Sequence, residues 1–85
     1  MSIQVDIHLR NGEVLRNDLE DFFFYSSEAM STNRTSWVLR WRELFKRIAK
    51  KPEDQRPSWY RKFTRIDIIG YPSLKFLREE VIEMW

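Results

Sequence analysis

The stretch that decides the fold is "RTSWVLRWRELFKRIAKK", residues 34–51. Its large apolar side chains recur at spacings of i, i+4, i+7, i+8 and i+11, at Trp37, Trp41, Leu44, Phe45 and Ile48. This is the period of an amphipathic α-helix. The pattern predicts a helix over residues 37–50 that ends before Pro52. Its apolar stripe packs on a core, and its basic side chains lie on the other side.

The segments on either side of this helix predict strands. "IQVDIHL", residues 3–9, alternates apolar with polar side chains, which is typical of a strand with one wet face. "NG" at residues 11–12 suits the two positive-φ positions of a type I′ turn, so residues 2–16 predict a hairpin. "WYRKFTRIDII", residues 59–69, is rich in β-prone side chains and runs into the turn "GYPS". It predicts a third strand over residues 60–69.

Two segments leave both types of structure open. Residues 17–30, "NDLEDFFFYSSEAM", predict either a short helix capped near Asn17 or Asp18, or a strand of clustered aromatic residues. Residues 73–85, "SLKFLREEVIEMW", predict either a helix capped by Ser73 or a strand pair in which "KFL" and "VIEMW" flank an "REE" turn. We favour the helix in both. The chain is thus expected to be one α+β domain over residues 1–85, with the 37–50 helix packed across the sheet.

The residues needed for common catalytic and metal chemistry are missing from the sequence. There is no cysteine and one histidine, His8, so a tetrahedral metal site has too few ligands. Ser26 and Ser27 have only His8 as a base, and two glycines cannot build a phosphate-cradling loop. We therefore expect a non-enzymatic protein with no catalytic residues, cofactor or metal. The N-terminus has no signal-peptide pattern, and the longest apolar run, residues 22–25, cannot span a membrane. A cytoplasmic protein without a membrane role is expected.

Charge is unevenly distributed although the net charge is only +2. Residues 1–33 hold two basic and six acidic side chains, residues 34–65 hold eleven and three, and residues 66–85 hold two and four. A basic middle of this kind predicts a nucleic-acid face made of Arg40, Arg42, Lys46, Arg47, Arg61 and Lys62. Trp59, Tyr60 and Phe63 would supply stacking rings beside it. Alternatively, the acidic flanks neutralise the basic side within the fold.

Aromatic residues provide the other functional hint. Thirteen of the 85 residues are Phe, Tyr or Trp, more than so small a core is expected to hold, so some should lie at an interface. Phe24 and Tyr25 fall outside the apolar stripe of their segment. The first hypothesis is a module that binds either another, acidic protein or a second copy of itself. Its expected contact residues are Phe24, Tyr25, Arg40, Arg42, Lys46, Arg47, Trp59, Tyr60, Arg61 and Lys62.

In overall composition the chain is similar to small accessory proteins of bacteriophages and mobile elements. That resemblance covers no specific residues. It implies a binding protein that inhibits or redirects a host factor. The second hypothesis is a nucleic-acid-binding protein that uses the basic 34–65 segment.

Overall fold

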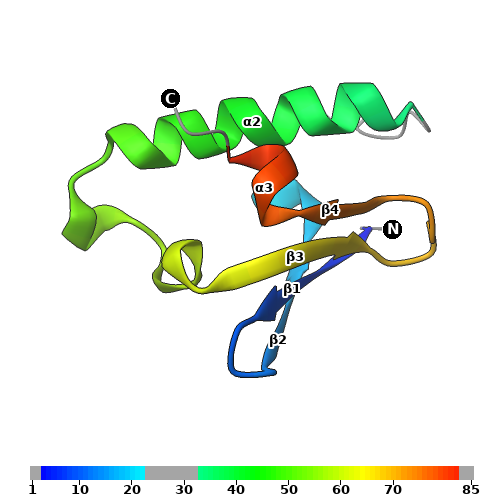
Figure 1. The fold of residues 1–85 in the computed structure, drawn as a ribbon, viewed down its shortest axis with the longest axis horizontal. Helices are drawn as coiled ribbons and strands as arrows, with labels where there is room; N and C mark the ends of the chain where they lie inside the picture. Colours follow the sequence, from blue (N-terminus) through cyan, green and yellow to red (C-terminus); the bar gives the residue numbers. More distant parts are fainter. Residues whose placement is uncertain (1–2, 23–32, 83–85) are drawn as a thin grey trace.

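In the computed structural model, which describes residues 3–22 and 33–82, a long helix packs against one face of a four-stranded antiparallel sheet (Figure 1). The strand order is β2-β1-β3-β4. The strands are β1 (Gln4–Leu9), β2 (Val14–Asp18), β3 (Phe63–Ile68) and β4 (Lys75–Leu77), and the helices are α2 (Arg34–Lys50) and the single turn α3 (Arg78–Val81). The α+β prediction is confirmed. None of the described helices is long and apolar enough to cross a membrane.

The N-terminal hairpin forms as predicted, with a different turn. Gly12 has φ +91°, but no non-glycine residue in the described ranges has positive φ, so a type I′ turn at residues 11–12 is wrong. Instead, residues 10–12 form a three-residue loop in which the Gly12 N–H donates to the Leu9 carbonyl at 3.0 Å. Asn11 Oδ1 accepts from the Glu13 N–H at 2.9 Å. Asn11 therefore supports the turn with its side chain, and glycine alone takes the left-handed backbone.

The third strand is present but begins later than predicted. Residues Ser58–Arg61 form a 3₁₀ turn after Pro57, in which the Tyr60 N–H donates to the Pro57 carbonyl at 3.1 Å. This turn directs the Tyr60 ring into the core, 5.9 Å from Phe45 between ring centroids. The strand starts at Phe63, the residue that pairs with Leu9 of β1.

The C-terminal segment combines parts of both interpretations. The favoured helix from Ser73 is wrong for its first half, because Lys75–Leu77 is β4 and pairs with β3. The alternative strand pair is right for "KFL" and wrong for "REE", which is the first turn of α3. In the 17–30 segment, Leu19–Asp21 form one 3₁₀ turn after β2. Residues 23–30 lie outside the described residues.

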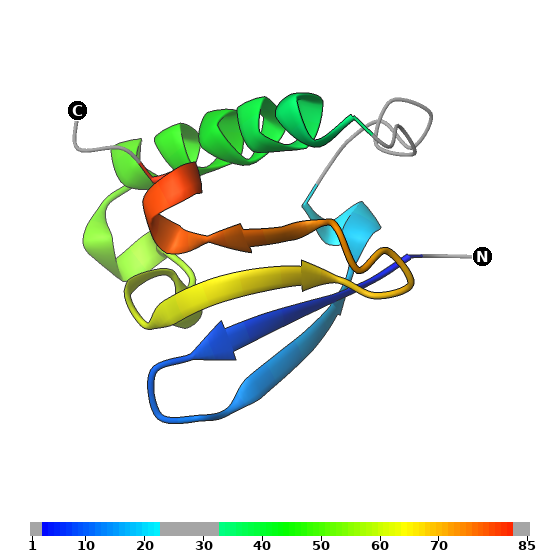
Figure 2. The same cartoon turned by 45° about the vertical axis from the view of Figure 1, so that its right-hand side comes forward.

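Helix α2 lies over one face of the sheet (Figure 2), and it packs there through aromatic pairs. Its buried residues are Trp37, Trp41, Phe45 and Ile48, as the spacing predicts, while Leu44 is half-buried. The helix begins at Arg34, earlier than predicted, because the Asn33 side chain accepts from the Thr35 N–H and caps it. The Phe45 ring stacks on Phe63 at 5.1 Å, and the Trp37 ring stacks on Phe76 of β4 at 6.3 Å.

The aromatic content is largely explained by this core. Of the nine described aromatic residues, six are buried, at Trp37, Trp41, Phe45, Tyr60, Phe63 and Phe76. The other three, Phe22, Trp59 and Tyr71, pack half-buried against them. All nine described rings are buried or half-buried in this core, while the expectation that a small core cannot hold all thirteen stays a prediction. Aromatic excess is thus no longer an argument for an interface among the described residues.

Candidate functional site

The side of the sheet opposite α2 carries the polar halves of the strand alternation. Cross-strand pairing arranges these side chains in rows. One row runs Val14, His8, Arg65, Leu77, the next runs Arg16, Asp6, Asp67, Lys75, and a shorter one runs Asp18, Gln4, Ile69. We call these residues the open face, because no described helix packs on them.

Two carboxylates lie side by side at the centre of the open face. Asp6 of β1 is directly opposite Asp67 of β3, and each is only 8% exposed. Like charges in directly opposed positions destabilise a sheet. Each of these carboxylates is therefore expected to need a cation of its own.

Arginine meets this need on both sides. Arg16 donates from Nε to Asp6 Oδ1 at 2.9 Å and from Nη2 to Oδ2 at 3.3 Å. Arg65 donates in the same manner to Asp67, at 2.8 and 3.1 Å. Such two-bond pairs fix the guanidinium plane. The hydrogen bond from Arg16 holds the pKa of Asp6 below its usual value, against the opposing effect of burial.

His8 completes the cluster. Its Nε2 lies 2.9 Å from Asp67 Oδ2, and its ring is half-buried beside Arg65. This position agrees with the predicted wet face of the first strand. No group of three or more His, Cys, Asp or Glu residues in ranges 3–22 and 33–82 is arranged to hold a metal ion.

Depth separates the two signs of charge on the open face. The side chains of Asp6 and Asp67 are 11% and 12% exposed, whereas those of Arg16 and Arg65 are 65% and 40% exposed. Lys75, next to Asp67 in the same row, is also exposed. The charged groups exposed to solvent on this face are therefore mainly cations, and the carboxylates lie beneath them.

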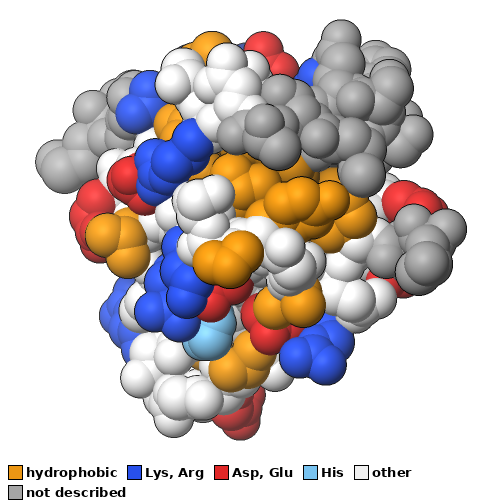
Figure 3. Space-filling model, turned by 90° about the vertical axis from the view of Figure 1, so that its right-hand side faces the viewer, with side chains coloured by type: hydrophobic (Ala, Val, Ile, Leu, Met, Phe, Trp, Pro, Cys, Tyr) orange, Lys and Arg blue, Asp and Glu red, His pale blue; other side chains and the backbone are white. Residues whose placement is uncertain are grey.

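Exposed aliphatic side chains border the ion pairs. Val14 is 46% exposed, Ile69 42% and Leu77 49%. Together with Leu39 of α2 they are the exposed large hydrophobic residues of the described chain, and three of these four lie on the open face. In Figure 3 the histidine has basic, acidic and hydrophobic side chains close around it. A mixed surface of this kind is typical of protein contacts.

The aromatic residues expected at the site have different roles. Phe24 and Tyr25 lie outside the described residues. Tyr60 and Phe63 are buried against Phe45, so their rings are not available as stacking platforms. Trp59 is half-buried and contacts Phe45 and Phe63 edge to face. The structure brings Trp59, Tyr60 and Phe63 together around Phe45.

The expected basic residues are divided between two parts of the molecule. Arg40, Arg42, Lys46 and Arg47 lie along α2, whereas Arg61 and Lys62 lie at the 3₁₀ turn before β3. Arg42 is half-buried and donates to the Glu80 carbonyl at 2.9 Å, and Arg61 forms an ion pair with Glu53. Lys46, Arg47 and Lys62 are exposed, and Arg40 is half-buried.

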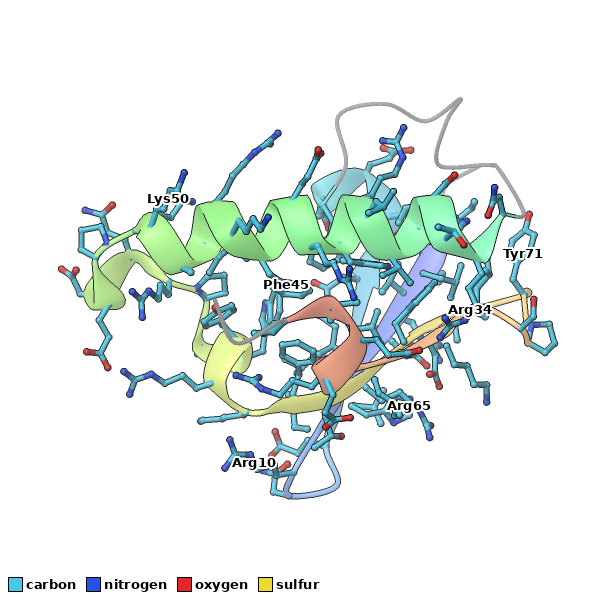
Figure 4. All side chains as sticks on the ribbon, turned by 45° about the horizontal axis from the view of Figure 1, so that its top comes forward. Arg10, Arg34, Phe45, Lys50, Arg65 and Tyr71 are labelled. Carbon is cyan, nitrogen blue, oxygen red and sulfur yellow. The ribbon has the colours of Figure 1, made fainter. Side chains whose placement is uncertain are left out.

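Several other arginines bind the main chain. Arg78 donates to the Tyr60 carbonyl at 2.6 Å, and Arg56 donates to the Ala49 and Lys51 carbonyls at the end of α2. The lysines differ from them. Within residues 3–22 and 33–82, no side-chain hydrogen bond or ion pair is found for Lys50, Lys51, Lys62 or Lys75. Figure 4 shows Lys50 pointing away from the sheet, while Phe45 lies beneath α2.

Sequence reasoning missed Arg16, Val14, Ile69 and Leu77 as parts of one surface. The alternation in β1 does place Asp6 and His8 on a wet face, and Arg65 and Asp67 follow the same alternation in β3. What the sequence lacks is the register that sets these strands side by side. No known family model matches the chain, and neither a characterised protein nor a solved structure shows significant similarity to it.

Proposed function

We propose that this protein is a non-enzymatic protein-binding module whose contact surface is the open face of the sheet. The observation that carries the proposal is that the cations of this face lie at its surface and the anions lie below them. Exposed aliphatic side chains surround arginines whose carboxylate partners are buried beneath them. Protein interfaces are enriched in arginine, and contact with a partner would remove the exposed aliphatic side chains from water, which favours association.

Pre-organisation strengthens this argument. Association costs about 0.5–1.5 kcal/mol for each long side chain that becomes immobilised. Arg16 and Arg65 are already held by two hydrogen bonds each, at 2.8–3.3 Å, so much of this cost is met in the free protein. The Nη1 group of each arginine makes no bond to another described residue. It is available to a partner's carboxylate or carbonyl oxygen.

The same face is poorly suited to nucleic acid. It carries three cations, Arg16, Arg65 and Lys75, against three carboxylates, and it presents no aromatic ring for base stacking among the described residues. Phosphate binding depends on an excess of positive charge over several contacts. A protein surface is therefore the better match.

The test is a matched pair of charge insertions. Leu77→Glu places a carboxylate among the open-face aliphatics, and Leu39→Glu makes the same change at a similarly exposed leucine on α2. Tagged protein and both variants would be used for quantitative affinity capture from lysate of the source cells. We expect Leu77→Glu to lose the captured protein and Leu39→Glu to retain it. Equal loss or equal retention in the two variants would argue against this face.

A second candidate function is nucleic-acid binding, through the exposed lysines at the C-terminal end of α2. Lys50 and Lys51 lie there, and their side chains, like that of Lys62, form no hydrogen bond or ion pair with another described residue. Fluorescence anisotropy with random DNA and RNA, at about 50 and 200 mM salt, tests it. Affinity that falls by orders of magnitude across this range would favour nucleic acid. Flat or absent binding would remove the candidate.

A further inference from the structure

The two edges of the sheet are treated differently. At the β4 edge, Arg34 Nη2 donates to the Lys75 carbonyl at 2.8 Å, and the Leu77 N–H donates to Glu80 Oε2 at 2.9 Å. Arg34 and Glu80 are bound to each other at 2.7 and 2.8 Å. The ion pair thus occupies a main-chain acceptor and a donor that an added strand would use. The β4 edge is closed.

The β2 edge has no such cover among residues 3–22 and 33–82. The Leu19 N–H donates to the Ile3 carbonyl and the Glu13 carbonyl accepts from the Leu9 N–H, so the main-chain groups at these odd-numbered positions face β1. In an antiparallel strand, the main-chain N–H and C=O groups of successive residues point to opposite sides. The main-chain groups of Val14 and Arg16 therefore point away from the sheet. The Asp18 N–H bonds to Asp21 Oδ2 at 3.4 Å, which closes the far end. No described strand pairs with this edge.

The β2 edge adjoins the exposed part of the open face. Val14 is 46% exposed and the Arg16 side chain 65% exposed, and both belong to β2. A strand added here would hydrogen-bond to the main chain of β2. On the open-face side, its own side chains would lie beside Val14 and Arg16. The edge gives affinity, and the two side chains give selectivity.

We infer that the partner binds as an extended segment added to the edge of β2, with an acidic side chain beside Arg16 and an aliphatic one beside Val14. This inference rests on the proposed function. Charge complementarity selects the partner, since the cations are outermost and the carboxylates buried. A second copy is disfavoured, because two-fold pairing about Arg16 sets Arg16 against itself, and opposed like charges are destabilising.

A display library of random peptides about ten residues long tests the inference, since that length covers a typical strand. The protein selects peptides, and their affinities are then compared for Val14→Pro and Val14→Ala. Proline removes the outward N–H and is tolerated at the first residue of an edge strand, whereas alanine keeps that N–H. We expect enriched peptides to alternate acidic and aliphatic residues. Val14→Pro should lower the affinity for these peptides at least about tenfold, and Val14→Ala should lower it by less than about threefold.

A charge reversal gives a readout that does not depend on the proline variant folding. Arg16→Glu should shift the selected peptides from acidic to basic side chains at the position that faces residue 16. Circular dichroism would check that each variant is folded. An unchanged acidic preference in Arg16→Glu would overturn the inference.

The outcomes separate this inference from the proposed function. Loss of binding with Leu77→Glu but not with Val14→Pro would overturn strand addition and leave the open face as the contact surface. Retained binding in both would remove both proposals. Failure to enrich any peptide would overturn the inference. So would a concentration-dependent dimer of the wild-type protein that Val14→Pro abolishes, because it assigns the edge to a second copy.

Discussion

At the scale of single residues, Arg78 shows how a cation becomes part of this core. Its guanidinium carbon lies 4.7 Å from the centroid of the Phe63 ring, and Nη1 donates to the Tyr60 and Phe63 carbonyls at 2.6 and 3.3 Å. Burial lowers the pKa of Arg78, yet arginine starts high enough to stay charged. The side chain connects α3 to the start of β3 and to the 3₁₀ turn before it. Without it, main-chain carbonyls at that junction would lose a charged donor.

Arg78→Lys should therefore destabilise the protein although it keeps the charge. A lysine is a point charge without the planar fork, so it cannot reproduce both the ring stacking and the carbonyl bonds. We expect a loss of about 1.5–3 kcal/mol in the free energy of unfolding, measured by urea denaturation. Arg10→Lys is the control, since the exposed side chain of Arg10 makes one hydrogen bond, to the Arg61 carbonyl. Equal effects in the two variants would contradict the role given to Arg78.

The Asp6 carboxyl group should give the protein part of its acid sensitivity. Because Arg16 lowers the pKa of Asp6, this group stabilises the fold above its unfolded pKa of about 3.9. That stability is lost as pH falls through the lower folded pKa. Asp6→Asn should be less stable than wild type near neutral pH, with a difference that shrinks in acid. Urea denaturation at a series of pH values measures it. Arg16→Gln should likewise flatten the dependence of the free energy of unfolding on pH. If this dependence is as steep in Asp6→Asn as in wild type, Asp6 is not a source of the acid sensitivity.

At the scale of whole elements, local patterns account for α2 and the hairpin, and tertiary contacts account for the rest. The apolar spacing from Trp37 to Ile48 spans three turns, long enough for the helical period to dominate. β4 and α3 are three and four residues long, too short to carry a period. Their structure is determined by pairing with β3 and by the Arg34–Glu80 bonds, which join residues 46 apart. The open face likewise requires the β1–β3 register, which neither strand specifies alone.

Closure of the β4 edge predicts a specific failure when it is removed. Arg34→Ala combined with Glu80→Ala frees the Lys75 carbonyl and the Leu77 N–H, and exposed edges of this kind pair with other chains. We expect the double variant to self-associate more strongly than wild type in sedimentation velocity over a concentration series. Glu79→Ala, at an exposed neighbour on the same helical turn, should behave as wild type. If the double variant sediments as wild type does, the ion pair has no role in protecting the edge.

At the scale of the whole molecule, the two faces of the sheet have different roles. One face meets α2 and holds the buried aromatic rings, while the other holds the ion pairs and exposed aliphatics. A chain of 85 residues has a total stability of about 4–13 kcal/mol. Phe45 sits where the helix meets the sheet, with ring centroids 6.0 Å from Trp41, 5.9 Å from Tyr60 and 5.1 Å from Phe63. A large share of the total therefore depends on this contact.

Phe45→Ala should cost about 3–5 kcal/mol, because it removes buried aromatic area and leaves a cavity between α2 and β3. Phe45→Leu should cost less and stay folded at low temperature. Since Phe45 is on the covered side of the sheet, Phe45→Leu should keep wild-type affinity for the selected peptides while its thermal midpoint falls. Leu44→Ala, at a half-buried neighbour, should lower the midpoint less than Phe45→Ala. A Phe45→Leu protein that is folded but has lost peptide binding would show that the two faces are coupled, and would contradict this division.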